Sequence, residues 1–445
     1  MNTPVKLSII DRYASLLKMI AIGILVLLFL IPTNMIQNLI QERENNQNDV
    51  INQVANSWGD KQYIGGPILS VPYLAKVEDD NRRFKMVKMY LHIMPESLKI
   101  NGNLKSTPLK RSIYEVAVYK GDLDISGDFR IDPYELDQMN AADLLWNEAV
   151  LWMEISDLRG VKDELKINWN NTSLFFRPGL KTRSLAESGV SVPIKMEMID
   201  NISTFKFSMK MKLNGSQTIQ FYPVGKTTEV KMASDWSSPN FNGAFSPDNR
   251  DILKEKKGFT ADWKILHLNR NFPQVFKESE HQYGDYAFGV ELHQTVDQYQ
   301  KSMRSVKYAA MFITLTFLVF FFTEIINQKA IHPIQYILIG LALVVFFTLL
   351  ISMAEHIGFN ASYMLAACAV VSLITFYTHA VLKSLKLTAI MATVLIVLYG
   401  FIYTIIQLED FALLFGSIGL FLFLATMMIA SRKIDWYQIV KKEDE

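Results

Sequence analysis

The chain has 445 residues, 50% of which are hydrophobic, and its 45 Lys and Arg residues nearly balance its 44 Asp and Glu residues, so the formal net charge is +1. This balance excludes the strongly basic surface with which nucleic-acid-binding proteins attract phosphates. The single cysteine, Cys368, lies within an apolar run, which excludes an internal disulfide and zinc sites built from several cysteines. The hydrophobic residues separate a membrane part from a soluble part large enough to bury a core.

The first predicted element is an apolar segment near the N-terminus. Uninterrupted apolar residues run only from Met19 to Ile31, a length that also fits the hydrophobic region of a signal peptide. No small-residue cleavage site follows, and 16–36 gives the roughly 20 residues that a membrane helix needs if the Lys18 ammonium reaches the interface. We therefore predict a cytoplasmic N-terminus at 1–15 and an uncleaved signal anchor at 16–36, with a cleaved signal peptide as the alternative.

The middle segment, 37–307, has the composition of a soluble domain. Polar residues with spaced apolar positions at 41–54 predict a helix that continues out of the membrane. After Trp58, apolar and polar residues alternate with the period of two that is typical of half-buried strands. Strands are predicted at 68–74, 84–93, 113–119, 149–155, 190–199, 204–213, 218–221, 229–233, 260–268 and 286–293. Many short strands with frequent turns favour a sandwich-like, mostly β domain with a possible subdomain break near 177–188.

A specific turn is predicted between the strands at 204–213 and 218–221. These two runs are separated by Asn214-Gly215 and two further residues. Asn-Gly between alternating strands is a strong hairpin signal, because the tight turn needs positive φ at both central residues. We therefore expect the two strands to pair with each other.

Five long apolar runs follow the middle segment almost without interruption. Each has the roughly 20 residues needed to cross a hydrocarbon layer about 30 Å thick. The predicted spans are 308–326, 334–354, 361–381, 388–406 and 411–429, and 430–445 forms a cytoplasmic tail. The fold class is therefore a bundle of six transmembrane helices, one before and five after a large, mostly β domain.

Lysine and arginine in the short connecting segments predict the orientation. If the N-terminus is cytoplasmic, the cytoplasmic segments contain Lys6, Arg12, Lys18, Lys329, Lys383, Lys386, Arg432, Lys433, Lys441 and Lys442. The opposite short loops, 355–360 and 407–410, contain neither Lys nor Arg. Lys301, Arg304 and Lys307 oppose the rule, but they end a long domain, and long domains translocate largely regardless of charge. We predict both termini in the cytoplasm of a bacterium and the middle domain in the periplasm.

Short motifs that resemble ligand sites are incomplete in this chain. Asp122–Asp128 begins like a calcium-binding EF-hand loop, but the twelfth position, which needs a bidentate Glu, is Pro133. Gly225-Lys226-Thr227 resembles the end of a phosphate-binding loop, but the glycine required earlier is replaced by Gln220. The seven histidines are scattered, and the common hydrolase, zinc-protease and dinucleotide motifs are missing. We expect no catalytic residues, no cofactor and no metal.

Polar residues near the ends of the membrane spans allow two interpretations. Glu324, Glu355, His356 and His379 are ionisable, and such residues within spans are functional candidates because burying charge in lipid is costly. A transporter or receptor channel would use them. However, all four lie near an interface, and one plus five spans do not divide into the inverted repeats of many transporters. Structural anchoring is therefore the favoured interpretation, with transport as the alternative.

Aromatic residues are dense in the segment from Trp236 to Phe245. Their spacing favours a corner of the core with a tight turn at Gly243. The alternative is a partner-binding patch made of Trp236, Phe241 and Phe245.

Several stretches of the sequence together resemble the CreD family of bacterial inner-membrane proteins. They are Gly65-Gly66-Pro67-Ile68-Leu69-Ser70-Val71-Pro72, Met94-Pro95-Glu96-Ser97-Leu98, Arg111 with Ile113-Tyr114, Asp157-Leu158-Arg159-Gly160, Trp236–Phe245, Asp297-Gln298-Tyr299, Phe321-Phe322-Thr323-Glu324, His332-Pro333-Ile334-Gln335-Tyr336, Glu355-His356 and Ile434-Asp435-Trp436-Tyr437. The resemblance covers almost the whole chain in the same order. It implies a role in cell envelope integrity and in responses to β-lactams and colicins, usually under two-component control. It implies no known catalytic activity.

The expected protein is a non-enzymatic inner-membrane protein whose periplasmic domain binds or senses a periplasmic or envelope protein partner. Its other partner is the lipid bilayer, and its oligomeric state does not follow from these features. Coupling between domain and membrane is expected where the chain returns to the bilayer. The candidate coupling residues are Asp297, Tyr299, Arg304, Lys307, Glu324, His332, Glu355 and His356.

Overall fold

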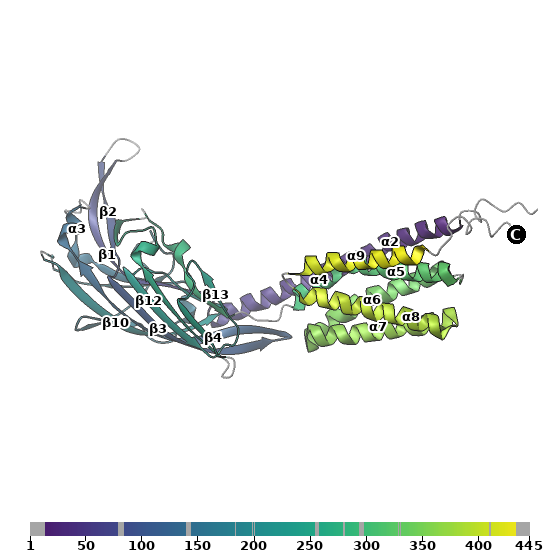
Figure 1. The fold of residues 1–445 in the computed structure, drawn as a ribbon. Coiled ribbons are helices and arrows are strands. Elements are labelled where there is room, and N and C mark those ends of the chain that lie inside the picture. Colours follow the sequence, from purple (N-terminus) through teal and green to yellow (C-terminus); the bar gives the residue numbers. More distant parts are fainter. Residues whose placement is uncertain are drawn as a thin grey trace, which may run out of the picture. The chain divides into compact units, whose positions relative to one another are not determined.

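The structure is a computed structural model that describes residues 14–78, 84–138, 144–182, 184–197, Ile199, 201–253, 258–278, 281–292, 298–327, Lys329, 331–408 and 411–432. The chain forms two compact units, Met1–Gln47 together with Val296–Glu445, and Asn48–Thr295. The first unit is helical and the second is mostly β (Figure 1). Six of the described helices are long and apolar enough to cross a membrane. The predicted fold class, one membrane helix before and five after a large β domain, is confirmed.

The helical unit contains the membrane helices and one short amphipathic helix. The helices are α2 (Ala14–Trp58), whose residues from Asn48 onward belong to the other unit, α4 (Gln298–Lys307), α5 (Ala309–Asn327), α6 (Pro333–Ile357), α7 (Phe359–Leu382), α8 (Leu385–Gln407) and α9 (Ala412–Ser431). Helix α2 has 45 residues and is therefore about 68 Å long, more than twice the hydrocarbon thickness. Its apolar first half is a candidate span, and its polar second half confirms the helix predicted at 41–54.

The bundle core is aromatic. The Phe312 and Tyr399 ring centroids lie 4.4 Å apart, edge to face, and the Phe346 ring lies 5.0 Å from Tyr399 in the same geometry. The Tyr363 hydroxyl donates to the Tyr399 carbonyl at 2.8 Å. Such contacts hold α5, α6, α7 and α8 together through dispersion and ring electrostatics. The hydrophobic effect contributes little here, because the surrounding lipid tails are as apolar as the side chains. In contrast, no residue of the α9 span is buried among the described residues.

The second unit is a sandwich of two mixed sheets. The sheet that contains β1, here called the β1 sheet, has the strand order β13 (Pro239–Gly243), β17 (Phe288–Leu292), β11 (Thr218–Phe221), β1 (Gln62–Glu78), β5 (Val150–Ile155), β9 (Gly189–Pro193) and β8 (Arg177–Pro178), with β2 (Phe84–Ile93) beside β1 and β16 (Val275–Lys277) beside β2. The β4 sheet has the order β14 (Asn249–Ile252), β15 (Phe259–Leu266), β12 (Thr227–Ser234), β3 (Ser97–Arg111), β4 (Tyr114–Ile131), β10 (Ser203–Ser216), β6 (Lys166–Trp169) and β7 (Thr172–Phe175). Figure 1 shows the long strands of this domain and the short helix α3 (Pro133–Gln138).

The two sheets differ in how they are buried. Along β10, Phe207, Met209 and Met211 are buried, and the residues between them are exposed, so the β4 sheet covers the core with one face and meets water with the other. The segment 64–73 of β1 is buried throughout, so the β1 sheet is covered on both faces along this segment. One continuous core includes residues from both sheets and Ala186 from the segment 177–188.

The predicted hairpin at Asn214-Gly215 is wrong. Both residues lie inside β10, and the chain turns only at Gln217, whose φ is +58°. Strands β10 and β11 then belong to different sheets, because β10 pairs with β4 and β6, whereas β11 pairs with β1 and β17. A side chain at Gly215 would place its Cβ 2.3 Å from the Tyr119 hydroxyl oxygen. The glycine therefore permits a close approach of Tyr119 rather than a tight turn.

The stretch that resembles a calcium loop is part of a strand, as its alternation indicated. Asp122 and Asp124 lie in β4 opposite Lys212 and Lys210 of β10. The Lys210 ammonium lies 3.8 Å from the Asp124 carboxylate. Opposite charges across neighbouring strands explain the acidic run without a bound ion.

Candidate functional site

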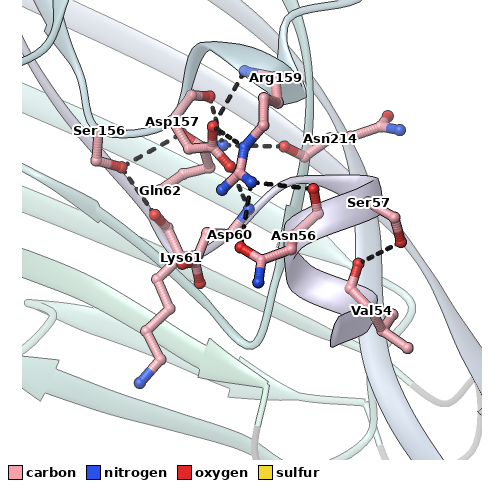
Figure 2. Close-up of polar contacts among 10 residues, drawn as sticks. All are labelled: Val54, Asn56, Ser57, Asp60, Lys61, Gln62, Ser156, Asp157, Arg159 and Asn214. Carbon is pink, nitrogen blue, oxygen red and sulfur yellow. Dashed lines mark hydrogen bonds and ion pairs between the residues drawn. The ribbon is translucent and has the colours of Figure 1, made fainter. Parts of the chain in front are cut away.

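A network of polar side chains surrounds the end of α2, where the chain enters β1. We call Asn56, Asp60, Gln62, Asp157 and Arg159 the junction cluster (Figure 2). The Arg159 guanidinium donates to the Asn56 carbonyl at 3.0 Å and to its side-chain oxygen at 3.1 Å. The last carbonyls of a helix have no partner within the helix, so an arginine there satisfies one of them and also complements the helix dipole.

Asp157 holds Arg159 in this position. Its carboxylate accepts from the Arg159 Nε at 2.8 Å, from the Arg159 backbone N–H at 3.1 Å and from the Asp60 backbone N–H at 2.8 Å. Burial alone would raise the pKa of Asp157, but these hydrogen bonds and the Arg159 charge lower it below its ordinary value. The carboxylate therefore stays ionised and ties the end of α2 to the segment after β5.

Backbone packing makes the junction cluster tight. The Gln62 side-chain amide donates to the carbonyls of Asp157 and Asn214, each at 3.1 Å. A Cβ at Gly160 would lie 2.2 Å from the Asn214 carbonyl oxygen. Trp58 donates from its indole to the Tyr119 carbonyl at 3.3 Å. The family-like run Asp157–Gly160 is thus explained by its role in docking α2, a role that sequence reasoning did not assign.

In the helical unit, Glu324 is the centre of a second network, which also includes Lys18, Tyr336 and the backbone of Ile331. Its carboxylate forms an ion pair with Lys18 and accepts from the Tyr336 hydroxyl at 3.0 Å and the Ile331 backbone N–H at 3.1 Å. The Lys18 ammonium also donates to the Ile331 carbonyl at 2.6 Å. Lys18 thus joins α2 to α5 and to the loop before α6.

A third network, the Glu355 cluster, lies at the other end of the bundle. The Tyr299 hydroxyl donates to Glu355 at 3.0 Å, and the Arg43 Nε lies 3.9 Å from the same carboxylate. Lys301 donates to the Gln407 side chain at 3.2 Å. These contacts fasten the amphipathic helix α4 and the middle of α2 to the bundle.

The remaining predicted coupling residues have different environments. His332 caps α6, because its ring Nδ1 accepts from the Ile334 N–H at 3.3 Å. Arg304 lies half-buried on α4, and Lys307 and His356 are exposed. Asp297 lies outside the described residues. Tyr299, Glu324 and Glu355 therefore converge on two separate networks and not on one.

The aromatic patch predicted at Trp236, Phe241 and Phe245 packs against the core. Phe241 contacts Trp263 edge to face at 5.9 Å between ring centroids. Phe245 stacks with Tyr286 at 6.4 Å. All three predicted residues are half-buried and border the main core, as the core-corner interpretation describes.

Two ionisable groups of the β1 sheet, the buried His92 and the half-buried Glu154, were not identified as candidates from the sequence. His92 is fully buried, lies 2.7 Å from the Ser70 hydroxyl and 3.0 Å from the Ser184 hydroxyl, and its burial lowers its pKa to about 4. Glu154 accepts from the Tyr283 hydroxyl at 2.7 Å, and burial raises its pKa to about 7, although this hydrogen bond opposes the shift. No local sequence signal marks either residue, because the partners lie far away in the chain.

The geometry defines a class of protein before any comparison. It is a multi-pass membrane protein with a two-sheet domain inserted between its first and second spans, and its polar networks join helices and strands. Among the described residues, no group of three His, Cys, Asp or Glu side chains could hold a metal ion.

Comparison with known proteins gives the family. The family model described as "Inner membrane protein CreD" matches residues 14–437. The chain is also 31% identical over 418 residues to a protein named Inner membrane protein CreD from Escherichia coli (strain K12), an alignment that covers 93% of this chain and 91% of that protein. The chain belongs to the CreD family and is a multi-pass inner-membrane protein in contact with the lipid bilayer.

Proposed function

We propose that the β domain lies in the periplasm and binds an extended segment of an envelope protein, through which this non-enzymatic protein contributes to envelope integrity and stress responses. The observation that carries the proposal is an exposed ribbon, the β1–β2 arm, made of 74–78 and 84–88. Among the described residues, the backbones of these two segments form strand pairs only with each other. Five large apolar side chains on them are more than 40% exposed: Leu74, Val77, Phe84, Met86 and Val87.

The arm has apolar residues on both faces. Residues opposite each other share a face and successive residues alternate, so Leu74, Phe84 and Met86 lie on one face and Val77 and Val87 on the other. A two-stranded ribbon is only marginally stable alone in water. Covering both faces and pairing one edge would stabilise it.

The occupant that suits these features is a polypeptide strand. The outer edge of β2 carries backbone N–H and C=O groups that an added strand would pair, while its side chains would cover the ribbon. A bilayer would cover apolar side chains but has no hydrogen-bonding partners for a strand edge in its hydrocarbon core. The observations therefore favour a protein partner over a lipid surface.

In-cell cross-linking tests the proposal. A photoreactive amino acid placed at position 84 or 86 should capture the same envelope protein, and Val87→Asn should reduce the yield at both positions. Position 210 is the matched control, because Lys210 is an exposed strand residue on the β4 sheet. Capture of the same protein at position 210, or no captured protein at 84 and 86, would contradict binding through the arm.

The alternative of a transporter or receptor channel receives less support. Glu324 is engaged by Lys18 and Tyr336, and Glu355 is engaged by Tyr299. A groove between α5, α8 and α9 has almost only apolar side chains as its lining. These features suit helices held together in lipid better than a hydrated path for ions or polar substrates.

A further inference from the structure

The helical unit contains a groove between α5, α8 and α9 whose lining is almost entirely apolar. The volume of this groove is about 390 Å³. Leu315 of α5, Val394 and Phe401 of α8, and Leu422 and Phe423 of α9 contribute to its walls. For comparison, an apolar cavity of about 150 Å³ in a soluble protein is enough to bind benzene. An empty groove of this size would deprive its walls of dispersion contacts.

Water does not suit the groove. The hydroxyl-bearing side chains in its lining are Thr393 and Thr426. Thr393 donates to the Ala389 carbonyl at 2.9 Å, and Thr426 donates to the Leu422 carbonyl at 2.8 Å. A buried water needs two to four polar partners. Both hydroxyls donate within their own helices and can only accept from a water, and the other lining side chains are apolar, so the groove is a poor site for water.

A helix from a second copy does not fit either. A membrane-spanning helix is about 30 Å long and about 10 Å wide. The groove extends over residues 393–401 of α8, which is about 12 Å of helix, so it matches less than half the length of such a helix. A narrow, flexible, apolar chain meets these dimensions.

We propose that an acyl chain of a bilayer lipid binds in this groove. The groove is continuous with the lipid-facing surface, because Val397, Leu420 and Leu422 line it and are also about half exposed or more. A lipid is therefore the molecule already in contact with its opening. No residue of the α9 span is buried among the described residues. The bound chain would supply the packing that attaches α9 to α5 and α8.

Photolabelling of the full chain tests this site. The protein is reconstituted into nanodiscs that contain a phospholipid with a diazirine in the middle of one acyl chain, and labelled peptides are identified by mass spectrometry. Val394→Phe fills the groove, whereas Ile396→Phe adds the same ring to the lipid-facing surface of α8 outside the lining. We expect several-fold less labelling of 419–427 in Val394→Phe than in the wild type, and no such loss in Ile396→Phe.

Two results would overturn the proposal. One is labelling of 419–427 that is equal in the wild type and Val394→Phe. The other is a cross-link between 419–427 of two protein copies in place of the lipid label. Leu315→Phe fills the groove from α5 and should reproduce the effect of Val394→Phe, which guards against a local folding defect in one variant.

Discussion

At the scale of single residues, long-range partners decide the chemistry of the ionisable groups. Glu324 could have served a proton path, but the fold places Lys18 beside it across more than 300 residues of sequence. His92 is buried and Glu154 is half-buried, in both cases by residues that lie far away in the sequence. The free energy of unfolding should therefore depend on pH through both groups.

Stability should depend on pH through two opposing groups. Between pH 4 and 6.5 the folded state binds fewer protons at His92 than the unfolded state, because the His92 pKa falls from 6.5 to about 4. Its contribution therefore strengthens as pH rises. Between pH 4.5 and 7 the folded state binds more protons at Glu154, whose pKa rises from 4.5 to about 7. Its contribution is present at low pH and is lost as pH rises. Each is worth up to about 3 kcal/mol.

Substitution should separate these contributions. In Glu154→Gln, the free energy of unfolding should rise more steeply between pH 4.5 and 6.5 than in the wild type, because the opposing contribution of Glu154 is gone. In His92→Gln, the free energy of unfolding should fall over the same range, because only the contribution of Glu154 remains. Unfolding of the full chain in detergent, followed by tryptophan fluorescence at several pH values, measures both. Parallel pH profiles for the wild type and the two variants would refute the assignment.

The Lys18–Glu324 pair should behave as a coupled unit. Lys18→Met or Glu324→Gln alone leaves one polar partner without its counterpart in a largely apolar bundle, at a cost of roughly 2–4 kcal/mol. The double variant should be less destabilised than the sum of the single variants. Thermal unfolding in detergent, with the four proteins compared in a double-mutant cycle, measures the coupling. Additive losses would show that the two side chains act independently.

At the scale of elements, periodicity predicted strands and membrane helices better than turns. Alternation in β10 and apolar length in α5 to α9 follow directly from the environments of those elements. The hairpin predicted at Asn214-Gly215 is wrong because strand pairing outweighs the local turn preference. The pairing of β10 with β4 continues through both residues. The end of α2 is held by Arg159, which donates to the Asn56 carbonyl, and by Asp157, which holds Arg159 in place. Both residues come from a different part of the chain.

The junction at the end of α2 should be sensitive to added volume. Gly160→Ala places a methyl group against the Asn214 backbone, and overpacking against backbone costs about 1–3 kcal/mol. Gly284→Ala is the control, because a Cβ at that position would have no atom within 4 Å and the φ of Gly284 is not positive. The control should stay near wild-type stability in thermal unfolding. Equal loss in both variants would contradict the close packing at Gly160.

At the scale of the whole molecule, the two compact units have different surfaces and surroundings. The helical unit contacts lipid, and the β unit has its own continuous core and an exposed apolar arm. In the proposed topology, which the distribution of Lys and Arg favours, the β unit would lie in the periplasm.

Thiol labelling tests that topology. In a Cys368→Ser background, Ser208→Cys on the exposed face of β10 should react with a membrane-impermeant maleimide in cells whose outer membrane alone is permeable. Lys383→Cys, between α7 and α8, should react only after the inner membrane is disrupted. The reverse pattern would invert the proposed orientation.

The sequence by itself determined the six apolar helices, the mostly β insert and the family resemblance, because hydrophobic length and alternation report the local surroundings of each element. It also located Glu324, Glu355 and Tyr299 among the candidates. Only the tertiary structure decided which partners they have, which strands share a sheet, why Gly160 and Gly215 must be glycine, and where the bundle leaves an apolar groove. These features depend on contacts between residues far apart in the chain, and neither composition nor periodicity contains that information.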